Sequence, residues 1–236
     1  MEVGRICGLR QGFFTLHKVN ADNNMKKTLF TILIILAGIG IACLVFATDS
    51  GALSPQTMAD DNATGTVAWS SPDNAKASDD VYATSTFNTA ISHYLKATNF
   101  GFSILSGATI DGILVEIEKK ASVAGRVSDT TVKIVKADAT FGTENKALGG
   151  TWTTSDTYYS YGSSTDLWDE TWTPVDINDA DFGVGISGSI TGGITAISVD
   201  HIRITVYYTE AGGGGQRVQI KTGRFSIQQG RIQIAQ

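Results

Sequence analysis

The stretch Asp-Gly-Ile-Leu-Val-Glu-Ile-Glu-Lys at positions 111–119 places the apolar residues Ile113, Val115 and Ile117 at every second position. The stretch 201–208 repeats this alternation with apolar residues at 202, 204, 206 and 208. A period of two is the pattern of a β-strand with one buried face and one wet face, which is typical of antiparallel sheets. These two stretches therefore predict long antiparallel strands that contribute to one core.

Further β-branched and aromatic runs are separated by Gly, Asn, Asp and Ser throughout the region 48–210, and no helical period lies between them. We expect strands at 66–70, 81–85, 92–97, 100–104, 110–119, 131–137, 158–162, 182–187, 194–199 and 201–208. So many short strands with turn-rich connections predict an all-β fold, a two-sheet antiparallel sandwich of the jelly-roll kind.

Two sequence motifs resemble those of known modules. Within 95–119 lie Phe-Gly-Phe-Ser-Ile at 100–104 and Ser-Gly-Ala-Thr-Ile-Asp-Gly-Ile at 106–113, and Thr-Pro-Val-Asp-Ile-Asn at 173–178 precedes Asp-Phe-Gly-Val at 181–184. These segments resemble secreted bacterial and phage jelly-roll modules of the DNRLRE type and carbohydrate-binding-like domains. The resemblance implies a β-sandwich of an extracellular protein, and it transfers no functional residue.

An export signal precedes the predicted sandwich. Two lysines follow Met25, an apolar run covers 29–46, and Val45-Phe46-Ala47 offers small residues for signal-peptidase cleavage. We therefore expect a signal peptide at 25–47, a true start at Met25, an upstream extension at 1–24 outside the fold, and a secreted or cell-surface product. The alternatives are a retained membrane anchor at 29–46 and a lipoprotein acylated at Cys43.

Charge and cysteine content limit the partners of the region after Ala47. Both cysteines, Cys7 and Cys43, precede Thr48, so a cleaved product has no disulfide. Residues 48–210 carry 9 Lys and Arg against 21 Asp and Glu, a net charge of −12. Such an acidic body repels phosphate backbones, which argues against nucleic acid as a partner.

The C-terminal end has its own organisation. A glycine-rich linker at 211–216 leads to three heptapeptide repeats at 217–236, whose apolar residues lie two apart, so each repeat predicts a short β-strand. Their exposed apolar face and cations favour docking or self-association, in which we expect Arg217, Arg224, Phe225 and Arg231 to take part. The alternative is a meander that packs on its own domain.

The region 152–172 is rich in aromatic rings, interleaved with Thr, Ser, Asp and Gly. Flat apolar rings beside polar side chains suit the recognition of sugars. Tyr161 and Trp168, with Asp166 and Asp169, are the candidate glycan-binding residues. The alternative is that these rings fill the core of the sandwich.

A calcium ion is the one cofactor that the sequence suggests. Asp176, Asn178 and Asp181 offer alternating oxygen ligands, although the same residues suit Asx turns without any ion. Catalytic motifs are missing, and the two histidines after Ala47, His93 and His201, each lie within a predicted strand. The sequence therefore favours a structural or adhesive surface protein that is not an enzyme, with a carbohydrate-binding module as the alternative and a secreted glycoside hydrolase as the least favoured function.

Overall fold

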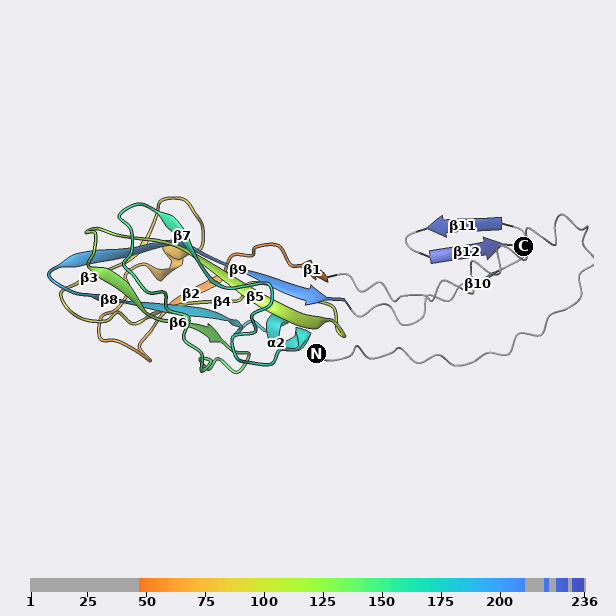
Figure 1. Cartoon of the computed structure of the whole chain (residues 1–236), viewed down its shortest axis with the longest axis horizontal. Helices are drawn as coiled ribbons and strands as arrows, with labels where there is room; N and C mark the ends of the chain where they lie inside the picture. The colour runs from red at the N-terminus through yellow and green to blue at the C-terminus, as the bar shows by residue number, and fades with distance from the viewer. Residues whose placement is uncertain (1–46, 211–218, 221–223, 229–230, 236) are drawn as a thin grey trace, which may run out of the picture. The chain divides into compact units, whose positions relative to one another are not determined.

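The computed structural model describes residues 47–210 together with 219–220, 224–228 and 231–235 (Figure 1). The first range folds into two antiparallel sheets, of five and four strands. The five-stranded sheet contains β1 (Ala47–Asp49), β3 (Ala83–Phe87), β5 (Thr109–Ala121), β7 (Thr157–Gly162) and β9 (Thr195–Thr209). The four-stranded sheet contains β2 (Thr57–Asp61), β4 (Tyr94–Thr98), β6 (Val127–Val135) and β8 (Gly183–Ile190). The predicted two-sheet sandwich is confirmed.

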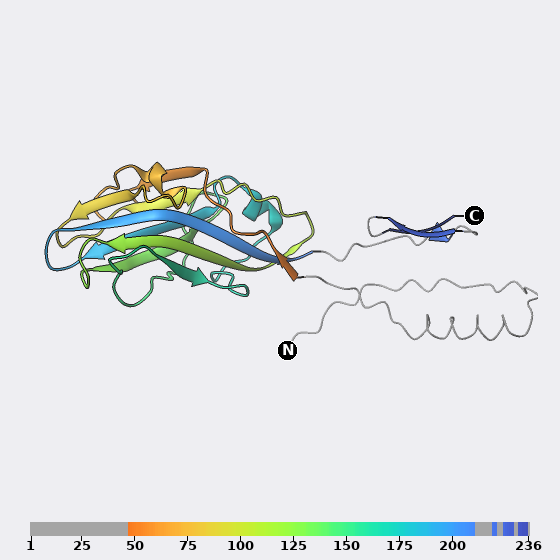
Figure 2. The ribbon, with the colours of Figure 1, turned by 90° about the horizontal axis from the view of Figure 1, so that it is seen from above.

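From β1 to β9, every connection between successive strands passes from one sheet to the other. Of these nine strands, the odd-numbered ones lie in the five-stranded sheet, in the order β1-β9-β5-β7 with β3 also paired to β9, and the even-numbered ones lie in the order β2-β4-β8-β6. Figure 2 shows the two layers, with β9 and β5 running side by side along the domain. Repeated crossing between two sheets is the arrangement expected of a jelly roll.

The strands β5 and β9 form the centre of the core. Their inward side chains Ile113, Val115 and Ile117 pair with Val206, Ile204 and Ile202, and all six are fully buried. Burying one such side chain contributes about 1.5–3 kcal/mol, so this pair of strands stabilises the sandwich strongly. The period-two pattern of both segments is thus confirmed as the signature of one buried face.

The structure corrects the prediction of separate strands at 194–199 and 201–208. They form the single strand β9, and the register against β5 shifts between Glu118 and Lys119, which leaves Asp200 as an extra residue. A β-bulge of this kind reverses the phase of the alternation. The buried apolar positions are therefore Ile197 and Val199 before Asp200, and Ile202, Ile204 and Val206 after it.

Two of the predicted strands are wrong. Residues 66–70 and 100–104 form no strand, although Phe100, Phe102 and Ile104 are buried in alternation. The segment 173–178 contains the short helix α2 (Pro174–Asn178), which Thr173 begins through a capping box with Asp176. A 3-10 turn, η1 (Pro72–Ala75), lies between β2 and β3.

The C-terminal repeats pair with one another. Strands β10 (Gln219–Ile220), β11 (Arg224–Gln228) and β12 (Arg231–Ala235) form a sheet in the order β10-β12-β11, with β11 antiparallel and β10 parallel to β12. In this register Phe225 lies opposite Ile234, and Ile227 lies opposite Ile232. The apolar positions of these two repeats therefore face one another across the ladder.

Candidate functional site

The aromatic region 152–172 belongs largely to the core. Trp152, Tyr161 and Trp168 are buried, at 2%, 1% and 0% exposure, and Tyr159 and Trp172 pack against the same core. A ring with no exposed face cannot stack on a sugar. The structure therefore corrects the prediction that Tyr161 and Trp168 contact a glycan, and it supports the alternative that these rings are packing residues.

Trp168 anchors the loop that follows β7. Its indole N–H donates to the carbonyl of Ile113 at 3.0 Å, while the Ile113 N–H donates to the carbonyl of Asp166 at 2.9 Å. Trp168 and Asp169 adopt left-handed φ values of 59° and 53°, which costs about 1 kcal/mol or more for each residue other than glycine. This strained turn directs the ring inward and leaves Asp166 and Asp169 on the surface.

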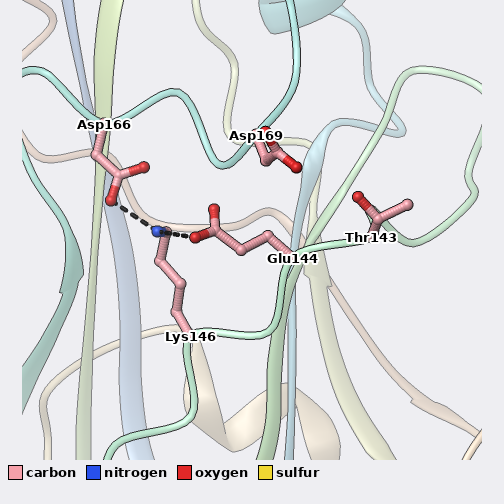
Figure 3. A pocket seen from close by; sticks show the side chains of 5 residues that line it. All are labelled: Thr143, Glu144, Lys146, Asp166 and Asp169. Atoms are coloured by element: carbon pink, nitrogen blue, oxygen red, sulfur yellow. Dashed lines mark ion pairs between the residues drawn. The ribbon is translucent and has the colours of Figure 1, made fainter.

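These two aspartates line a surface pocket of about 470 Å³ with Thr143, Glu144 and Lys146. We call these five residues the carboxylate pocket. Figure 3 shows Lys146 between the carboxylates of Asp166 and Glu144, to which its Nζ lies at 2.7 and 2.8 Å. The same Nζ lies 5.2 Å from the centre of the Trp168 ring.

The connection between β6 and β7 supplies the other half of the pocket. Backbone N–H groups of Gly142 and Lys146 donate to carbonyls of Ile134 and Val132 on β6, each at 2.9 Å. Asn145 joins the same strand through its side chain, because its Oδ1 accepts from the Val132 N–H at 2.9 Å. The sequence contained no signal for these pocket residues, since they lie in a polar connection without a motif.

Within the pocket, Lys146 and Asp166 stabilise each other in their ionised forms. Partial burial acts to raise the pKa of Asp166, but hydrogen bonds from the Lys146 side chain and the Trp168 backbone outweigh it, so the pKa is lowered. Burial acts to lower the pKa of Lys146, and the bonds to Asp166 and Glu144 reverse this and raise it. Asp166 is therefore a fixed hydrogen-bond acceptor at neutral pH rather than a proton donor.

A second hollow of about 500 Å³ lies beside β1 and the C-terminal end of β9. The side chains of Tyr207, Asp49 and Asp111 line it, together with Ala47, Thr48, Ser164, Thr165 and Thr209. Asp111 already accepts a hydrogen bond from the Thr209 hydroxyl at 2.7 Å. This hollow offers a tyrosine ring but no side-chain cation.

The three residues proposed to bind calcium have other contacts. Asp176 accepts from the Thr173 N–H at 2.8 Å in the capping box, and Asn178 bridges both backbone groups of Ile104 at 2.8 Å. Asp181 is exposed, and its N–H bonds to the Asp179 carboxylate. Across the described residues, no three His, Cys, Asp or Glu side chains come together in an arrangement that could hold a metal ion.

His93 and His201 occupy different environments. His93 pairs with Asp60 at 2.8 Å near the surface. His201 is buried on the outer side of β9, where its ring nitrogens bond to Ser54 and Tyr158 at 2.8 Å each. Burial, followed by the nearby Arg203, lowers the pKa of His201.

Several predicted features fall wholly or largely outside the described residues. They include the signal peptide up to residue 46, the linker and Arg217; the side chains of Arg224, Phe225 and Arg231 are likewise not described. Within the part of the chain that is described, no helix has the length and hydrophobicity to span a membrane.

Residues 47–210 thus form a two-layer β-sandwich with a polar surface pocket. No protein-family model matches it, and no curated protein is significantly similar. Three of the solved structures that it resembles are carbohydrate-binding domains by name. They include BiXyn10A CBM1, with 9% identity, a TM-score of 0.32, and 70% of this chain and 97% of that chain covered.

The CBM22-1 xylan-binding domain of Paenibacillus barcinonensis Xyn10C is 11% identical, with a TM-score of 0.31 and coverage of 68% and 95%. The N-terminal cellulose-binding domain of Cellulomonas fimi β-1,4-glucanase C is 9% identical, with a TM-score of 0.26 and coverage of 68% and 86%. Similarity this slight carries no functional argument, so function must be argued from the pocket.

Proposed function

We propose that the sandwich is a non-catalytic module of an extracellular protein and binds a glycan at the carboxylate pocket. The observation that carries this proposal is the pocket itself, in which Lys146 fixes the carboxylates of Glu144 and Asp166 beside that of Asp169. Carboxylate oxygens accept hydrogen bonds from sugar hydroxyls, and an ammonium donates to sugar oxygens. Acceptors held in place before binding lose little entropy when the ligand arrives.

The same geometry disfavours two other ligand or reaction classes. A metal ion would have to displace the ammonium of Lys146, which already lies between the carboxylates of Asp166 and Glu144. A glycosidase needs one carboxyl group with a raised pKa to act as a general acid, whereas the pKa of Asp166 is lowered. These two observations favour binding over hydrolysis at this pocket.

The test is a glycan array probed with the full chain, followed by calorimetry on the sugars that bind. Lys146→Met should abolish or strongly weaken binding, while Lys120→Met, which removes a lysine paired with Asp156 elsewhere, should leave it intact. Tyr207→Ala tests the second hollow. Loss of binding in Tyr207→Ala but not in Lys146→Met would contradict the carboxylate pocket as the site.

A second candidate function is self-association through the C-terminal repeats. In the sheet of β10, β11 and β12, the outer strands β10 and β11 each pair on one side only within the described residues. An unpaired strand edge is a template for the addition of another strand. In the full chain, Phe225→Asp should lower the mass measured by light scattering, whereas Ser226→Asp at the next position, on the opposite face of the strand, should not.

A further inference from the structure

A lysine lies in the interior between the two sheets. Lys119 follows Ile117 on the inner side of β5 and is fully buried. Its Nζ contacts the carboxylate of Asp129 on β6, in the opposite sheet, and that side chain is 2% exposed. Burial of an ion pair costs free energy that apolar residues of similar size would not. An amine and a carboxyl group are thus held together away from water.

Aromatic rings enclose the amine. Its Nζ lies 4.4 Å from the centre of a Trp152 ring, 4.5 Å from that of Tyr159 and 5.2 Å from that of Tyr161. Burial lowers the pKa of Lys119 to about 8, and the attraction of Asp129 offsets this only in part. The neutral amine is the nucleophilic form. At neutral pH, a larger fraction of Lys119 is therefore neutral than of an exposed lysine.

The carboxylate of Asp129 has a separate partner on each oxygen. Oδ1 accepts from the indole N–H of Trp152 at 2.8 Å, and Oδ2 accepts from the Tyr161 hydroxyl at 2.9 Å and from the Leu148 N–H at 3.1 Å. The Tyr161 hydroxyl also contacts Nζ of Lys119. The Tyr161 hydroxyl therefore lies between Nζ of Lys119 and Oδ2 of Asp129. The indole N–H of Trp152 donates to the other oxygen, Oδ1.

We propose that Lys119 and Asp129 form a modification site, at which the two side chains condense into an isopeptide bond that joins the two sheets. In the buried pair, a proton passes from the ammonium to the carboxylate, and the amine then attacks Cγ of Asp129. Trp152 stabilises the negative charge on Oδ1. Tyr161 passes a proton from the nitrogen to Oδ2, the Cγ–Oδ2 bond breaks, and water leaves. One C–N bond replaces one C–O bond, and no atom is oxidised or reduced.

The bond would give the sandwich a covalent link without cysteine. Residues 48–210 contain no cysteine, so a disulfide cannot supply one there. An amide between β5 and β6 instead ties the layers together close to the connection at 122–126. Unlike an ion pair, it persists in denaturant and at any pH used for unfolding.

The test is mass spectrometry of the full chain after denaturation and trypsin digestion. The expected product joins peptides 97–120 and 127–133 and is lighter than their sum by one water molecule, with fragment ions that assign the link to Lys119 and Asp129. Lys119→Met and Asp129→Ala should each release peptide 127–133 free. Tyr161→Phe should leave a mixture, and complete linkage in that variant would overturn the proton transfer assigned to Tyr161.

The internal control is the pair Lys96 and Asp61, which are 2.5 Å apart but 23% and 21% exposed. Without burial, this pair should stay unlinked in the same digest. Because the wild-type protein decides the question, a variant that fails to fold does not obscure it. Peptide 127–133 recovered wholly free from the folded wild-type protein would overturn the proposal and show that Lys119 and Asp129 form an ion pair only.

Discussion

The indole N–H of Trp168 donates a 3.0 Å hydrogen bond to the backbone carbonyl of Ile113, so a ring from the loop after β7 is fixed to the central strand β5. The bond satisfies the indole N–H of this tryptophan, which is fully buried. It also couples the core to the carboxylate pocket, since Asp166 and Asp169 lie on either side of the anchored ring.

Replacement of Trp168 should therefore destabilise the sandwich. Trp168→Ala removes a fully buried ring, and we expect it to lower the free energy of unfolding by about 3–5 kcal/mol. Trp168→Phe keeps most of the apolar contact but orphans the Ile113 carbonyl, which costs about 1–3 kcal/mol. Urea denaturation measures both, and an alanine variant as stable as the wild type would contradict the role of the ring.

Gly112 sets the position of the loop that carries Asp166. A Cβ at this residue would lie 2.3 Å from the backbone carbon of Ser164 and 2.5 Å from the Ser163 oxygen. Gly112→Ala should therefore push the loop away, lower stability by about 1–3 kcal/mol and weaken glycan binding. Gly149→Ala is the matched control, because no atom lies within 4 Å of its Cβ, and it should leave both properties unchanged.

Substitutions of Asp169 should affect the stability of the sandwich and its binding of glycan differently. Its φ of 53° is strained for a side chain with a Cβ, so Asp169→Gly should leave stability unchanged or raise it by up to about 1 kcal/mol. Asp169→Val, which is β-branched, should lower it by about 1–2 kcal/mol. Both variants lose a pocket carboxylate and should bind the glycan more weakly in calorimetry. Equal stability of the glycine and valine variants would argue against strain at this turn.

His201 should make stability depend on pH below its ordinary pKa of 6.5. Because burial lowers its pKa in the folded state, the unfolded chain takes up the proton first as the pH falls through 6.5. The free energy of unfolding should then decrease until the folded-state pKa is reached. His201→Gln should show a smaller decrease over this range. Identical pH profiles for the wild type and His201→Gln would exclude the effect.

The alternation of Ile113, Val115 and Ile117 was sufficient to predict β5, because a strand with one buried face imposes a period of two. The continuity of β9 could not be predicted in this way. The bulge at Asp200 reverses the phase of the alternation of buried residues in β9. In the sequence, such a reversal looks the same as a break between two strands. Phe100, Phe102 and Ile104 show the converse, since a segment can alternate in burial without pairing to any strand.

The candidate site was only half predictable. Asp166 and Asp169 were identified because they flank an aromatic ring, but the direction of the Trp168 side chain depends on a left-handed turn that composition does not reveal. Lys146 reaches the pocket from another connection, 20 residues away from Asp166. Lys119 was also missed, because a lysine at the end of a strand is normally solvated and only the opposing sheet shows that it is buried.

The pairing of β1 with β9 has a consequence for the way the chain is made. Ala47 lies opposite Thr209, so the first strand of the sandwich finds its partner only when the last strand has been synthesised. β5, near the middle of the chain, likewise pairs with β9 only after β9 has been synthesised. A growing chain therefore cannot complete the five-stranded sheet until its C-terminal strand has been synthesised.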